Sequence, residues 1–160
     1  MELLSNIISW KRISVITIMV LAVLVVLSFY GVYTNTFYLT KPDNYLIPFL
    51  SVVHFLYIYV IWFKIKEDEL PDPKMRNLEY AVYAIMLAYA FKIYESITIL
   101  NSVSSLQGHY IPETFFPMST SILVLYSLLF LLTLYSFWIR RRYVGVYNFE
   151  NFNDNLNMWQ

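Results

Sequence analysis

Two charged residues, Lys92 and Glu95, lie inside a long apolar stretch that runs from Leu78 to Leu100. A charged side chain near the centre of a bilayer costs about 2.5–3.5 kcal/mol on insertion scales, so a charge kept there is a candidate for function. The two residues are three positions apart, which makes them neighbours on a helix and allows an ion pair. The pair therefore belongs either to a path for protons, ions or substrate, or to a structural contact with protein.

His54 is the second candidate, because it lies near the middle of another apolar stretch. On a helix it shares one face with Ser51, Tyr57 and Ile61. A histidine at this depth can relay protons or bind a metal or haem. A haem held by two histidines needs a second one in the membrane, and the only other, His109, falls in a predicted loop. We expect no metal and no cofactor, and the alternative role for His54 is a hydrogen-bonded packing residue.

Three alanines extend the helical face that carries the charge pair. Ala81, Ala84 and Ala88 precede Lys92 and Glu95 at steps of three or four residues, so all five lie on one face. Small residues let a second helix approach closely and mark packing faces in membranes. This pattern predicts a helix-packing face that is turned toward protein and away from lipid.

The composition excludes several classes of protein. Of the 160 residues, 59% are hydrophobic and 14% are charged, which is too apolar for an ordinary soluble domain. The formal net charge is zero, so nothing indicates a nucleic-acid partner. The chain has no cysteine, which excludes disulfides and thiolate metal sites, and its three glycines form no phosphate-binding loop.

Four apolar stretches are long enough to cross a bilayer. They predict an all-α integral membrane protein with four transmembrane helices in a bundle. The predicted spans are about 13–33, 45–63, 78–100 and 118–139, within a transmembrane domain of residues 13–142. Residues 1–12 are expected to form an interfacial N-terminal lead, and residues 143–160 form a tail rich in asparagine and aromatic residues.

The distribution of positive charge predicts the orientation of these spans. Four spans place both termini on one side, and that side carries nine lysines and arginines between and beside the spans, whereas the other side has Lys41. The nine are Lys11, Arg12, Lys64, Lys66, Lys74, Arg76, Arg140, Arg141 and Arg142. The positive-inside rule then makes both termini cytoplasmic, and we expect a multi-pass protein of a prokaryotic cell membrane. With these limits, Lys92 lies about 4–5 Å and Glu95 about 9 Å outward of the midplane.

No catalytic constellation stands out, so the leading hypothesis is a non-catalytic accessory subunit of a larger membrane protein complex. Respiratory, oxidase and monooxygenase assemblies contain such small helical subunits, which is an analogy. Aromatic residues in the tail, Tyr147, Phe149, Phe152 and Trp159, are expected to dock onto a partner. The expected partners are thus the lipid bilayer and other membrane subunits.

Two other functions stay open. The first is a small oligomeric transporter or ion-conducting protein, in which Lys92, Glu95 and His54 would line the path. The second is a membrane enzyme acting on a lipid-soluble substrate, for which His54 and Glu95 are the one plausible acid–base pair. Tyrosine residues could assist this pair, but the chain alone shows no catalytic constellation, so we lean toward a protein that is not an enzyme.

Overall fold

The computed structural model describes residues 10–105 and 111–147 of the chain. Four long helices make up most of this part: α2 (Trp10–Leu27), α3 (Leu46–Lys66), α4 (Pro73–Asn101) and α5 (Phe115–Tyr143). Two 3-10 turns, η1 (Pro42–Tyr45) and η2 (Ser102–Ser105), lead into α3 and out of α4. Each of the four helices is long and apolar enough to cross a membrane, which confirms the predicted all-helical class with four candidate spans.

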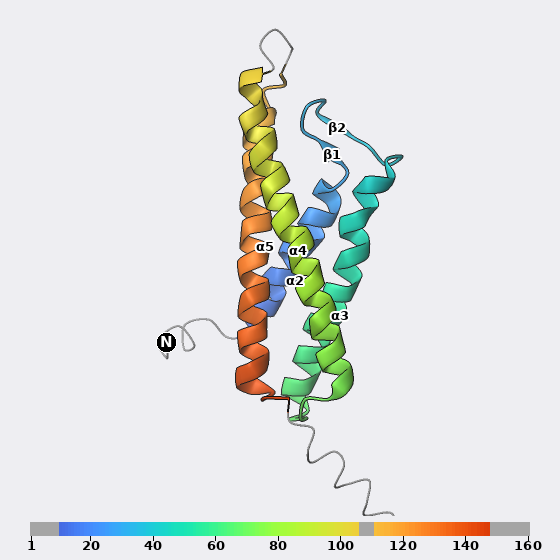
Figure 1. The fold of residues 1–160 in the computed structure, drawn as a ribbon, viewed down its shortest axis with the longest axis vertical. Coiled ribbons are helices and arrows are strands. Elements are labelled where there is room, and N and C mark those ends of the chain that lie inside the picture. The colour runs from blue at the N-terminus through green and yellow to red at the C-terminus, as the bar shows by residue number, and fades with distance from the viewer. Residues whose placement is uncertain (1–9, 106–110, 148–160) are drawn as a thin grey trace, which may run out of the picture.

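Successive helices run in opposite directions, so the bundle has two chemically different ends (Figure 1). At one end α2 begins, α5 ends, and a short turn joins α3 to α4. We call it the basic end, because nine of the eleven lysines and arginines lie at it. At the other end, which we call the hairpin end, two short strands join α2 to α3. Lysine and arginine are therefore distributed asymmetrically along the long axis of the protein.

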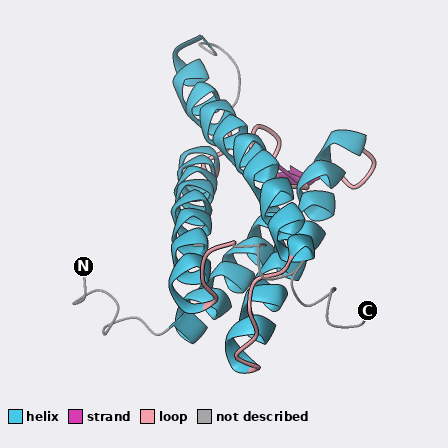
Figure 2. Cartoon of the chain, turned by 60° about the horizontal axis from the view of Figure 1, so that its bottom comes forward, coloured by secondary structure: helices cyan, strands magenta, loops and turns pink. Residues whose placement is uncertain are grey.

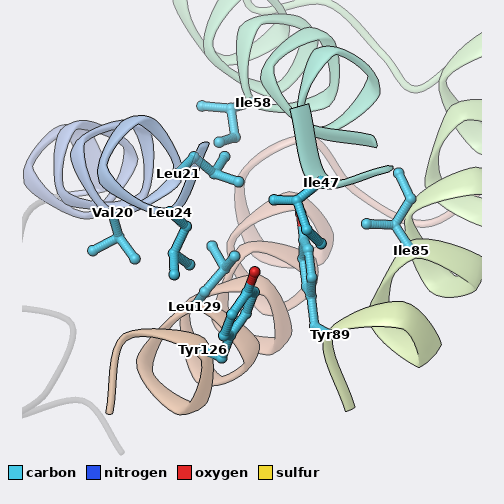
Figure 3. Packing of buried hydrophobic residues seen from close by; sticks show 9 residues of the cluster. All are labelled: Val20, Leu21, Leu24, Ile47, Ile58, Ile85, Tyr89, Tyr126 and Leu129. Atoms are coloured by element: carbon cyan, nitrogen blue, oxygen red, sulfur yellow. The ribbon is translucent and has the colours of Figure 1, made fainter. Parts of the chain in front are cut away.

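The core of the bundle is built by all four helices. Figure 3 shows its main cluster, in which Leu21 and Leu24 of α2 face Leu129 of α5. Tyr89 of α4 and Tyr126 of α5 belong to the same cluster, and their bulk fills the space between the helices. Of all the helix pairs, α4 and α5 pack most extensively on each other. The positions of α4 side chains therefore depend first on α5.

The first predicted span is too long. It was expected to reach residue 33, but α2 ends at Leu27 and the chain turns into an antiparallel hairpin of β1 (Tyr30–Gly31) and β2 (Thr36–Phe37), seen in magenta in Figure 2. The hairpin reverses at Asn35, whose φ of 53° lies in the left-handed region that asparagine tolerates. A short apolar helix and an aromatic-rich strand pair have similar composition, so hydrophobicity alone could not separate them.

The other three spans match α3, α4 and α5, but the helices continue further at the basic end than predicted. α4 begins at Pro73 instead of residue 78, because the Asp72 carboxylate accepts a hydrogen bond from the Met75 N–H and caps the helix. Proline is well suited to the first helical position, where no N–H is needed. α5 continues through its three arginines to Tyr143, since arginine is a good helix former.

Candidate functional site

Lys92 and Glu95 form an ion pair on α4, as their spacing allows. The Lys92 Nζ donates a hydrogen bond to Glu95 Oε2 at 2.6 Å. The two side chains are 25% and 43% exposed, respectively, so the pair is not enclosed by the chain's own helices. It lies in the half of α4 nearer the hairpin end, on the flank of the helix and not on its buried face.

A small polar cavity of about 150 Å³ adjoins this pair at the hairpin end. Its wall includes both charged residues, and polar groups supplied by three other segments complete it: Ser28, Tyr30, Asn44 and Tyr126. The Ser28 hydroxyl donates to the Asn44 carbonyl at 3.0 Å and ties the end of α2 to the start of α3. The cavity is large enough and polar enough to hold water, which would hydrate the two charges.

His54 lies at the centre of the bundle and is completely buried. Its Nδ1 is 3.0 Å from the Tyr89 hydroxyl of α4, and the two groups share a hydrogen bond. Its other ring nitrogen, Nε2, is buried and has no hydrogen-bond partner among the described residues. The predicted face of α3 is buried as a whole, since Ser51, Tyr57 and Ile61 lie on it with His54.

His54 does not contact the charge pair directly. No hydrogen bond or ion pair joins these residues within the described part of the chain. Tyr89, which is hydrogen-bonded to His54, and Tyr126 belong to the same core cluster (Figure 3). Tyr126 also lines the polar cavity with Lys92 and Glu95. His54 is therefore related to the charge pair only indirectly, through these two tyrosines.

A second ion pair, which the sequence analysis did not identify, lies near the basic end. The Arg140 Nη2 of α5 donates to Glu79 Oε1 of α4 at 2.7 Å, and the two side chains are 9% and 2% exposed. The Tyr83 hydroxyl donates to the same oxygen at 2.8 Å. The pair is thus buried, hydrogen-bonded, and built between the two helices that pack most closely.

The chain beyond α5 completes this site. Gly145 has a φ of 107°, which only glycine adopts readily, and its carbonyl accepts a hydrogen bond from Arg140 Nη1 at 3.0 Å. This turn brings Tyr147 back to the bundle, where its hydroxyl donates to Glu79 Oε2 at 2.7 Å and its ring stacks 4.4 Å from the Arg140 guanidinium. Burial, and then the hydrogen bond to Glu79, raise the pKa of the Tyr147 hydroxyl.

Tyr57 lies between the two polar regions. It follows His54 by one helical turn on α3, and its ring is fully buried. Its hydroxyl has no hydrogen-bond partner among the described residues, although it lies in the electrostatic field of both Glu79 and Arg140. His54 Nε2 and the Tyr57 hydroxyl are therefore two consecutive unpartnered polar groups in the bundle interior.

The signal for the buried pair was present but ambiguous. Glu79 is on the same helical face as Val82, Met86 and Tyr89, at steps of three or four, and this is the face that α4 buries. An acid on an apolar face needs a cation, and Arg140 is the arginine nearest the apolar part of α5. At the end of a span, however, the same residues are equally typical of a solvated helix terminus.

The alanine face lies outside the chain's own packing. Ala81 and Ala84 are exposed and Ala88 is half-buried, whereas the buried residues of α4 lie about a third of a turn around the helix. This face therefore does not pack against the other described helices of the same chain. That it contacts a second protein chain stays a prediction.

Three of the four tail residues expected to dock, Phe149, Phe152 and Trp159, lie outside the described residues, as does His109.

A third group of charges stabilises the turn between α3 and α4. The Lys64 Nζ lies 2.8 Å from Glu69 Oε2 and 3.0 Å from Asp72 Oδ2. Burial would raise the pKa of Asp72, but the N–H of Met75 and the Lys64 ammonium together hold that pKa below its usual value. This turn fixes the distance between the two helices at the basic end.

The described residues contain no group of three histidines or acids placed to hold a metal ion. The buried polar groups include the Glu79 carboxylate, tyrosine hydroxyls and the His54 imidazole, which are groups that can bind and release protons. Comparisons of this chain with protein-family models, with characterised proteins and with solved structures find no match. Function must therefore be inferred from these sites.

Proposed function

We propose that this chain is a non-catalytic subunit of a larger membrane protein complex, crossing the membrane four times with both termini in the cytoplasm. It would associate with a neighbouring subunit through the α4 face that carries Ala81, Ala84, Ala88, Lys92 and Glu95. The basic end, with its nine cations, would lie on the cytoplasmic side.

One observation carries this proposal: the α4 face holds exposed small residues next to an ion pair that is still 25% and 43% exposed within a span. Lipid cannot solvate such a pair, and intramembrane charges normally face protein or water. Alanines allow a second helix to approach within a short distance, where it can cover the pair. Water in the hairpin-end cavity would hydrate one side of the pair, and a neighbouring helix would cover the other.

The test is the native mass of the protein after extraction from its own membranes in mild detergent, with the co-migrating chains identified. We expect a large species with fixed partners. Ala84→Leu should release the chain from it, because the added side chain blocks close approach. Ala90→Leu is the matched control, since Ala90 is an exposed alanine on another face of the same helix.

A free monomer in the native extract would contradict the proposal. Equal loss of the complex in both variants would also contradict it, because the effect would then not depend on the alanine face.

A specific observation favours a second candidate, a proton-conducting protein. Protonatable groups follow one another through the bundle from the hairpin-end cavity to the basic end: Glu95, Tyr126, Tyr89, His54, Tyr57 and Glu79. Two successive members of this series, His54 and Tyr57, have buried polar atoms without a hydrogen-bond partner among the described residues.

This candidate is tested in proteoliposomes that contain a pH-sensitive dye, with a potential applied across the membrane. Tyr57→Phe should abolish proton flux, and because the hydroxyl has no partner to lose, the fold should be preserved. Tyr59→Phe is the control, since Tyr59 is 57% exposed on the outer face of α3. Undetectable flux in the unchanged protein, or equal flux in both variants, would exclude conduction along this path.

A further inference from the structure

A groove of about 470 Å³ runs between α2 and α3 in the half of the bundle nearer the basic end. Apolar side chains of both helices line it, among them Val15, Ile18, Phe55 and Trp62. Lys11 lies at its end toward the basic end. The groove therefore has an apolar interior and a cation at its mouth.

The mouth of the groove opens into a second depression of about 450 Å³. Trp10, Lys11, Trp62 and Lys66 line it, and the two lysines approach the tryptophan rings, with Lys66 5.2 Å from the Trp62 ring centre and Lys11 5.6 Å from that of Trp10. Tryptophan prefers the level of the lipid headgroups, where one part of its ring is apolar and the N–H is wet. This places the two ammonium groups where phosphates lie.

The dimensions of the groove fit one lipid leaflet. From Lys11 to Ile18 α2 rises about 10 Å, and from Phe55 to Lys66 α3 rises about 16 Å. The hydrocarbon core of a bilayer is about 30 Å thick, so one leaflet accounts for about 15 Å. An acyl chain that starts at the lysines would thus end near Ile18 and Phe55.

We propose that the α2–α3 groove binds one phospholipid with an anionic headgroup, its acyl chain lying along the apolar wall and its phosphate between Lys11 and Lys66. Lys11 has no ion pair with a described carboxylate. Lys66 pairs with Glu67 at 3.2 Å, but its side chain is 58% exposed, so a phosphate can also reach it. Basic pockets between membrane helices are known to hold anionic headgroups.

The test is native mass spectrometry of the protein from nanodiscs that contain equal amounts of phosphatidylglycerol and phosphatidylcholine. We expect one phosphatidylglycerol to be retained in preference to phosphatidylcholine. Each lysine near the surface is worth about a fivefold preference for an anionic lipid. The double variant Lys11→Gln/Lys66→Gln should lose most of the preference, whereas the equally charged change Arg141→Gln/Arg142→Gln should keep it.

A second pair of variants tests the apolar wall. Val15→Trp fills the groove and should prevent lipid retention, whereas Val23→Trp alters an exposed α2 position that is not part of the lining. Equal retention of both lipids, or equal behaviour of the two glutamine variants, would overturn the proposal. Retention that persists in Val15→Trp would do the same. These outcomes do not depend on whether the α4 face binds a partner subunit.

Discussion

The two ion pairs of α4 have the same chemistry but different surroundings. Glu79 and Arg140 are 2% and 9% exposed and share their hydrogen bonds with two tyrosines. Lys92 and Glu95 are 25% and 43% exposed. Among the described residues their side chains pair only with each other, and both line a polar cavity. The first pair joins two helices of one chain, and the second belongs to a single helix. One helix thus carries a buried interhelical ion pair near the basic end and a partly exposed ion pair in the half nearer the hairpin end.

This difference bears on function because the stability of the chain is expected to depend more on the first pair than on the second. Removing one partner of a buried pair costs about 3–5 kcal/mol, since the other charge is left buried, whereas water in the polar cavity can hydrate a charge left at Lys92 or Glu95. A pair that contributes little to the fold of its own chain is free to serve an interface or a path.

The largest effect is expected for Glu79→Gln. Loss of the carboxylate leaves Arg140 charged and buried without a counter-ion, which should lower the free energy of unfolding by about 3–5 kcal/mol. Thermal unfolding in detergent, followed by circular dichroism, measures it. In the double variant Glu79→Met/Arg140→Met no unpaired charge remains, so it should be more stable than Glu79→Gln. A double variant that is less stable would contradict this account.

A smaller effect is expected for Tyr147→Phe. It removes the hydrogen bond to Glu79 Oε2 but keeps the ring over Arg140, so it should cost about 1.5–3 kcal/mol, the range for hydrogen bonds to charged groups. The same variant should make the peptide bonds around Gly145 more accessible to protease. Tyr143→Phe is the control, because Tyr143 is 44% exposed. Equal cleavage in both variants would show that Tyr147 does not anchor the segment after α5 to the bundle.

Glu95→Gln should lower the stability of the isolated protein less than Glu79→Gln does, because water in the adjoining polar cavity can hydrate the Lys92 ammonium that is left. Its unfolding curve in detergent should lie closer to that of the unchanged chain than the curve of Glu79→Gln does. If Glu95→Gln were as damaging as Glu79→Gln, the contrast between the two pairs would fail.

The smallest effect concerns the turn between α3 and α4, and it depends on pH. The native pKa of Asp72 lies below its unfolded value, so its contribution to stability is complete above the unfolded value near 3.8 and is lost as the pH falls through the native pKa. Asp72→Asn keeps the helix cap and should remove this acid dependence. Asp72→Ala should also cost about 1 kcal/mol at neutral pH. A melting temperature of Asp72→Asn that still falls in the same acid range would refute the assignment.

The sequence was sufficient for the four-helix class, because long apolar runs have few alternatives in a chain this hydrophobic. It also grouped His54 with Ser51, Tyr57 and Ile61 on one face of a helix, because helical periodicity decides which residues share a face, and the structure shows this face to be buried. It missed the Glu79–Arg140 pair because the partners are far apart in sequence and both lie at span ends, where charges are expected anyway. It misplaced the end of α2 because strands of only two residues each leave almost no periodic signal.

The separation of Glu79 from Arg140 has a consequence for how the protein is made. Arg140 leaves the ribosome 61 residues after Glu79, which at about 5–20 residues per second is an interval of about 3–12 s. During that time the third helix holds an acid without its cation. An insertase that releases helices singly would pass Glu79 to the lipid without its cation, so α4 and α5 are best inserted together, as a hairpin.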